Sequence, residues 1–134
     1  LGGDRLDLNK CLRALPAAEP IPEALRPLLG GSLLGCDICQ EACPRNADVP
    51  MIDTPPDVRA ATDLPRLLSG DMRALSQIVG ANYARKKRTL ARALIAAANL
   101  KRRDCLPLIE ALTGDDYPAV REHARWAAVR LSSF

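Results

Sequence analysis

Aromatic residues are scarce in this 134-residue chain: they make up 3% of it, as one Trp, two Tyr and one Phe. A core built almost without them must be filled by Leu, Ala, Ile and Val, and apolar residues are 48% of the sequence. Because Ala, Leu and Arg favour helices, this composition predicts an all-α fold. The shortage of rings also argues against reading RNA bases by stacking.

Long apolar runs are absent as well. No stretch approaches the roughly 20 residues that a membrane-spanning helix needs, and the start, "LGGDRLDLNK", lacks the apolar segment of a signal peptide. We therefore expect a cytoplasmic protein, monomeric and without a membrane partner. The first residue is not Met, so we expect the sequence to be part of a longer protein.

Acidic residues are missing from one segment, residues 81–103, in a chain whose net charge is only +3. The segment carries eight basic residues: Arg85, Lys86, Lys87, Arg88, Arg92, Lys101, Arg102 and Arg103. A basic helix face can simply be solvated. Without acidic partners in the segment, however, these side chains also suit an RNA phosphate backbone, in contacts to shape and phosphate rather than to bases.

Five cysteines are present, an odd number whose clustering argues against a disulfide framework. Three of them lie in "GCDICQEACPRN", residues 35–46, with the spacing C-x2-C-x3-C-P. Bacterial ferredoxins use C-x2-C-x2-C-x3-C-P, in which the last Cys serves a second cluster. Laid on that pattern, the missing first Cys falls on Leu33, and Cys11 is the one upstream replacement.

The cysteine pattern therefore predicts ligands of iron–sulfur clusters, with Cys11, Cys36 and Cys39 on one cluster and Cys43 on another. A tetrahedral zinc site of the same four thiolates is the alternative, although structural zinc sites usually pair two C-x2-4-C turns and only one is present. We expect Cys105 to be a buried apolar side chain. The single His123 is expected at the surface of a charged helix.

Three regions follow from the distribution of proline, cysteine and apolar periodicity. Residues 1–46 are predicted to form a partial ferredoxin-like iron–sulfur lobe, 47–70 a linker rich in Pro and Asp, and 71–134 a HEAT-like helical region. The expected helices cover 71–79, 84–100, 104–112 and 117–131. Their expected N-caps are Asp71, Asp104 and Asp116, and Gly80 is expected to end the first.

The stretch from Cys11 to Asn46 resembles the second half of the iron–sulfur domain of the epoxyqueuosine reductase family. The matching text is Ile21-Pro22-Glu23, Arg26-Pro27, Gly30, Gly35-Cys36-Asp37, Cys39-Gln40, Cys43-Pro44 and Asn46. The tail "YPAVREHARWA", residues 117–127, resembles the last helix of the HEAT-like region of that family. Arg45 departs from the pattern, since an aromatic residue is common there.

The resemblance implies two [4Fe-4S] clusters, a cobalamin-binding domain upstream of Leu1, and reduction of epoxyqueuosine to queuosine in tRNA with electrons from a separate donor. It implies no catalytic residue in this part, which alone should be inactive. Two alternatives stay open. One is a related iron–sulfur and cobalamin reductase with another substrate, and the other is a non-catalytic helical-repeat interaction module with a vestigial metal site.

Overall fold

The computed structural model describes residues 7, 11–15, 19–50 and 52–133, and within these ranges the chain forms helices and loops without a β-strand. The all-α prediction is confirmed. The α-helices are α1 Ile38–Glu41, α2 Pro56–Ala61, α3 Leu64–Leu68, α4 Arg73–Val79, α5 Lys86–Asn99, α6 Leu106–Ala111 and α7 Pro118–Ser132. Short 3-10 helices cover Leu12–Ala14, Glu23–Leu25, Pro27–Leu29, Pro44–Asn46 and Arg103–Cys105.

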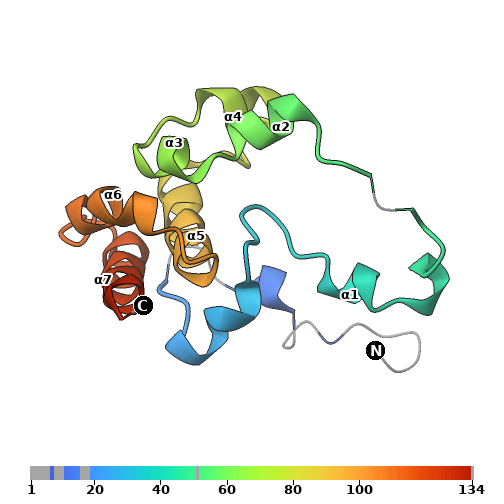
Figure 1. Cartoon of the computed structure of the whole chain (residues 1–134), viewed down its shortest axis with the longest axis horizontal. Helices are drawn as coiled ribbons and strands as arrows, with labels where there is room; N and C mark the ends of the chain where they lie inside the picture. Colours follow the sequence, from blue (N-terminus) through green and yellow to red (C-terminus); the bar gives the residue numbers. More distant parts are fainter. Residues whose placement is uncertain (1–6, 8–10, 16–18, 51, 134) are drawn as a thin grey trace.

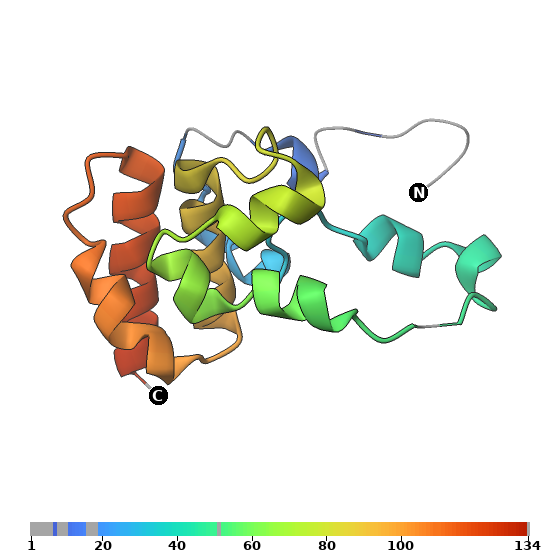
Figure 2. The same ribbon diagram turned by 90° about the horizontal axis from the view of Figure 1, so that it is seen from above.

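Helix α5 is the centre of the molecule. It stands between the α6–α7 pair and the group formed by α2, α3 and α4 (Figures 1 and 2). Every residue from Thr89 to Ala98 is buried, so the helix is covered on all sides rather than on one face. Its many alanines make this possible, because they favour the helix and let neighbouring helices approach closely.

Helix α7 packs along α5 with an apolar face of small residues. Ala119, Val120, Ala124 and Ala127 are all fully buried there. Pro118 occupies the first position of the helix, where its missing N–H costs no hydrogen bond. The predicted helices 84–100 and 117–131 thus agree with α5 and α7 to within two residues at each end.

The segment predicted as a linker contains two helices. α2 and α3 lie within residues 47–70, and α3 contributes Leu64, Leu67 and Leu68 to the main core. The prolines that suggested a loop stand at the first turns of these helices, where proline is compatible with helical backbone. The side chain of Asp63 accepts a hydrogen bond from the Arg66 N–H and caps α3.

Of the predictions about helix ends, the one for Gly80 is confirmed and the three N-cap predictions are wrong. Gly80 ends α4 with a positive φ of 80°, as expected. The N-cap position of α4 is Met72 rather than Asp71, although Asp71 Oδ1 accepts the Arg73 N–H at 3.1 Å. Tyr117 rather than Asp116 is the N-cap of α7, and Cys105 rather than Asp104 is that of α6.

Residues 21–30, here called the docking segment, fasten the N-terminal region to the helices. Ile21 and Leu29 form a second buried cluster with Ile95 of α5, and Trp126 of α7 packs against it. Asn99 Nδ2, at the end of α5, donates to the carbonyls of Arg26 and Gly30 at 2.8 and 3.0 Å. The packed seam that this segment forms with α5 and α7 includes two of the residues that carry the family resemblance, Ile21 and Arg26.

His123 lies inside this seam, which corrects its predicted surface position. The side chain is only 1% exposed. Its Nε2 accepts the Ile21 N–H at 2.9 Å, and its Nδ1 lies 3.0 Å from the Ala91 carbonyl oxygen of α5. These two partners fix the neutral tautomer with the proton on Nδ1. Burial lowers the pKa of His123 to about 4.

Residues 35–50, here called the arm, extend away from the helices before the chain returns to α2 (Figures 1 and 2). The arm carries α1 and two exposed apolar side chains, Ile38 and Val49. Nothing in the described residues forms a helix that is long and apolar enough to cross a lipid bilayer.

Candidate metal centre and basic surface

The cysteine motif folds into two consecutive tight turns. Cys36 lies in the loop before α1, Cys39 lies within α1, and Cys43 is the N-cap residue of the 3-10 helix Pro44–Asn46. The backbone N–H of Cys43 donates to the Gln40 carbonyl at 3.2 Å, so a tight turn follows the end of α1 at Glu41. Cys39 is exposed, and Cys36 and Cys43 are half-buried.

Two other motif residues tie these turns together. Asn46 Nδ2 donates to the backbone carbonyl of Gln40 at 3.0 Å and to its side-chain Oε1 at 3.1 Å. The Asn46 N–H also donates to the Cys43 carbonyl at 2.9 Å. Gln40 and Asn46 therefore hold the loop shape between Cys39 and Cys43 without offering a thiolate themselves.

The region of Cys11 is brought beside the Cys36 loop. Cys11 is half-buried and precedes the short helix Leu12–Ala14. The side chain of Arg92, on α5, contacts the Leu12 carbonyl at 3.5 Å. A small cavity joins the two regions, lined by Leu12, Arg13, Leu33, Leu34, Gly35, Cys36, Arg88 and Arg92. Leu33, where the ferredoxin pattern has a cysteine, thus shares this cavity with Cys36.

The four predicted ligands are not drawn into one group. Among the described residues, no three His, Cys, Asp or Glu side chains lie close enough together to hold a metal ion. The donors still suit the predicted cofactor, since thiolates are the ligands of iron–sulfur clusters. Cys11, Cys36, Cys39 and Cys43 stay a predicted ligand set. Cys105 is fully buried in the main core, as predicted, and burial raises the pKa of its thiol.

All the basic residues of 81–103 except Arg92, which lies in the middle of α5, stand at the two ends of this helix. Arg85 to Arg88 stand at its start and Lys101 to Arg103 after its end, about 20 Å apart for a helix of 14 residues. Arg85 and Arg103 are exposed, and the side chain of Lys86 lies across Gly70. The predicted RNA-binding residues therefore form two separate groups rather than one cluster.

Three of the eight basic side chains are engaged elsewhere. Lys87 Nζ pairs with Asp115 at 2.6 Å, and its hydrogen bond lowers the pKa of that carboxyl. Arg102 pairs with Asp104 at 2.6 Å on the surface. Arg92 is only 8% exposed. The acidic partners come from outside residues 81–103, which is why the segment alone did not reveal them.

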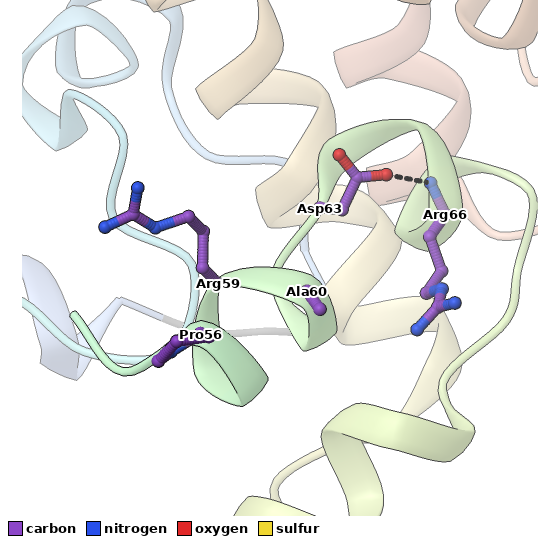
Figure 3. Close-up of a pocket in the computed structure, with 5 residues that line it drawn as sticks. All are labelled: Pro56, Arg59, Ala60, Asp63 and Arg66. Carbon is purple, nitrogen blue, oxygen red and sulfur yellow. Dashed lines mark hydrogen bonds between the residues drawn. The ribbon is translucent and has the colours of Figure 1, made fainter.

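A shallow groove of about 600 Å³ lies along α2 and α3. Pro56, Arg59, Ala60, Asp63 and Arg66 line it, and the guanidinium groups of Arg59 and Arg66 point to opposite sides of Ala60 and Asp63 (Figure 3). The sequence did not mark these arginines as candidate site residues, because the prolines around them predict a linker. The one sequence signal that could have paired Arg59 with Arg66 is their spacing of seven residues.

These features define a helical protein whose cysteine-bearing arm, with ferredoxin-type spacing, is attached beside a basic core helix. Comparison with known proteins gives the family. The chain is 30% identical over 138 residues to an epoxyqueuosine reductase of Bacillus cereus, which covers 96% of this chain. It is 34% identical over 136 residues to an epoxyqueuosine reductase of Xanthomonas campestris pv. campestris, covering 92% of this chain.

The predicted resemblance to the epoxyqueuosine reductase family is therefore confirmed over almost the whole sequence. The chain spans 36% and 38% of the length of these two relatives. It is also 32% identical over 139 residues to an uncharacterized protein in gldA 3'region of Geobacillus stearothermophilus, covering 96% of this chain and 64% of that protein. No family model matches the chain, and no solved structure matches it significantly.

Proposed function

We propose that this chain is the iron–sulfur and tRNA-contacting part of a cobalamin-dependent reductase that converts epoxyqueuosine to queuosine in tRNA. The observation that supports this proposal is the arm with Cys36, Cys39 and Cys43, in a chain that matches a protein named epoxyqueuosine reductase over 96% of its length. In this proposal the arm belongs to a ferredoxin-like lobe, and α5 to α7 form a HEAT-like stack.

The two halves of the chain have different roles. In this proposal Cys11, Cys36 and Cys39 would hold one [4Fe-4S] cluster and Cys43 would contribute to a second, and the clusters would supply electron transfer from an external donor to a cobalamin bound elsewhere in the protein. The docking segment fixes this lobe to α5 and α7 through His123 and Asn99. That attachment supports a fixed distance between the clusters and any RNA held by the helices.

The proposed tRNA contact uses the basic residues that remain available at the ends of α5. Arg85 and Lys86 at its start are exposed, as is Arg103 after its end. Neutralised phosphates release counterions, so binding through such residues falls steeply with salt. The separation of the two groups favours contact with two stretches of the RNA backbone over a single phosphate cluster.

Reconstitution tests the cluster. The anaerobic chain is incubated with ferrous iron and sulfide, desalted, and assayed for bound iron, sulfide and the broad visible absorbance of an iron–sulfur cluster. We expect Cys36→Ser to remove this absorbance and Cys105→Ala, which changes a cysteine remote from the arm, to retain it. Iron uptake that is equal in wild type and Cys36→Ser overturns the ligand assignment. A colourless chain that binds zinc instead supports the non-catalytic module.

Gel shifts test the RNA contact. The chain is titrated into tRNA carrying epoxyqueuosine and into the same tRNA without it, at low and at moderate salt. We expect the double variant Arg85→Gln/Lys86→Gln to weaken binding and to flatten its salt dependence. The matched control Arg73→Gln/Arg125→Gln removes the same charge from α4 and α7 and should bind as wild type. If the chain does not bind tRNA at low salt, the proposed tRNA contact is wrong, and a reductase with another substrate is favoured.

A further inference from the structure

Among the residues that the structure describes, Arg92 is a buried cation without a carboxylate partner. It lies in the middle of α5 and is 8% exposed. Its one hydrogen bond among the described residues is the 3.5 Å contact to the Leu12 carbonyl, and none of the ion pairs formed there includes it. A buried charge without a counter-charge is strongly destabilising, so its position requires an explanation.

The residues around Arg92 add positive charge and supply no carboxylate. Arg13 and Arg88 line the same small cavity, and among the residues that line it there is neither Asp nor Glu. Burial lowers the pKa of Arg92, and the positive charges of Arg88 and Arg13 lower it further. Cys36 acts in the opposite direction. Three arginines thus line the same cavity as one cysteine of the arm.

We infer that Arg92 is a positioning residue that compensates the negative charge of an iron–sulfur cluster bound at Cys36. The inference rests on the proposed function, because it requires a cluster on this arm. It also reassigns Arg92, which its place among the basic residues had marked as an RNA contact. Four thiolates make an iron–sulfur cluster anionic, and a cluster becomes more negative when it accepts an electron.

A buried positive charge beside Cys36 therefore has two effects. It stabilises the folded chain only when the cluster is present, since without the cluster the guanidinium is an uncompensated charge. It also favours the reduced cluster over the oxidised one, because net charge near a cluster sets its reduction potential. A guanidinium that merely fills space in the fold has neither effect.

The first test compares unfolding of the chain with and without its cluster. In the cluster-free chain, Arg92→Met should raise the midpoint denaturant concentration, because an apolar side chain of similar length replaces an unpaired charge. In the reconstituted chain, the same variant should lower the midpoint. Arg92→Lys, which keeps the charge, should retain the stabilisation by the cluster, and the exposed control Arg125→Met should shift neither midpoint. A shift of the same sign in both forms overturns the inference.

The second test measures the midpoint potential of the reconstituted cluster by dithionite titration. Arg92→Met should make reduction about tenfold less favourable, which corresponds to about 59 mV for a one-electron couple. Arg92→Lys should stay near wild type, and tRNA affinity should not change in either variant. An unchanged potential overturns the inference, as does a loss of tRNA affinity at constant potential. A wild-type chain that takes up no cluster overturns the proposed function itself, before any variant is compared.

Discussion

The Nε2 of His123 accepts the backbone N–H of Ile21 across 102 residues of sequence, at 2.9 Å and out of contact with solvent. The other ring nitrogen contacts the Ala91 carbonyl, so one imidazole joins the docking segment, α5 and α7. The ring must be neutral to accept from Ile21. This joint therefore depends on pH in a way that the surrounding apolar contacts do not.

The free energy of unfolding should fall between pH 6.5 and about pH 4. Above pH 6.5 His123 is neutral in both states, so its contribution is fully present. Below pH 6.5 the unfolded chain takes up a proton that the folded chain refuses until its own pKa, about 4, is reached. Each pH unit in this window is worth about 1.4 kcal/mol, so the loss approaches about 3 kcal/mol. Urea denaturation at intervals from pH 7.5 to pH 4.5 measures it.

A variant without the imidazole provides the control for this pH dependence. His123 is the only histidine of the chain, so His123→Gln should be less stable at pH 7 yet nearly independent of pH from 7 to 5. If the variant keeps the wild-type slope in that interval, another group carries the titration and the joint does not.

Asn99→Ala should destabilise the chain by about 1–2 kcal/mol, because the Arg26 and Gly30 carbonyls lose their donor at the end of α5. Asn99→Asp should cost more, since it turns a carboxylate towards two carbonyl oxygens. Chemical denaturation measures both. The matched control is Asn46→Ala in the arm, whose hydrogen bonds are exposed; it should change the stability of the core by less than about 0.5 kcal/mol.

Thr89→Val should stabilise the protein by about 1 kcal/mol. The Thr89 hydroxyl is buried in α5 and its Oγ1 has no hydrogen-bond partner among the described residues, so an isosteric methyl group removes a desolvated polar atom. The melting temperature and urea midpoint measure the gain. Thr113→Val is the opposite case, because that hydroxyl donates to the Glu110 carbonyl at 2.7 Å, and it should bring no gain.

Lys101→Gly should also stabilise the chain, by about 1 kcal/mol. Lys101 adopts a left-handed φ of 55° just after α5, while its N–H and that of Arg102 bond back to the carbonyls of Ala98 and Ala97. Glycine reaches this conformation without strain from a side chain. Leu100→Gly, one residue earlier at φ −84°, should instead lower the thermal midpoint. A loss of stability in Lys101→Gly contradicts the assignment of strain.

The long helices were predictable because their signals are local. The period of Leu90, Leu94 and Ala98 fixes α5, and Pro118 with the alanines after it fixes α7. The turns of the cysteine arm likewise follow from residues a few positions apart. Even His123 carried a local signal, since it lies four residues after Ala119 and four before Ala127 on the buried face.

What the sequence could not show are partners distant along the chain. Ile21, whose N–H donates to the buried His123 ring, is 102 residues away from it. Asp115 pairs with Lys87 across 28 residues. The burial of Arg92 depends on the N-terminal region folding back over α5. Pro56 and Pro65 favour a loop in the sequence, yet they stand in the first turns of α2 and α3, and the leucines of α3 are covered only by tertiary packing.

Two guanidinium groups lie over the ring of Trp126, the single tryptophan of the chain, with Arg26 5.4 Å and Arg130 5.5 Å from its centroid. Arg26 belongs to the docking segment, whereas Arg130 shares α7 with the indole. Release of the segment would remove one cation from the ring and admit water in its place. The intrinsic fluorescence of this protein is therefore a built-in reporter of whether the docking segment is attached to the helices, readable without any label.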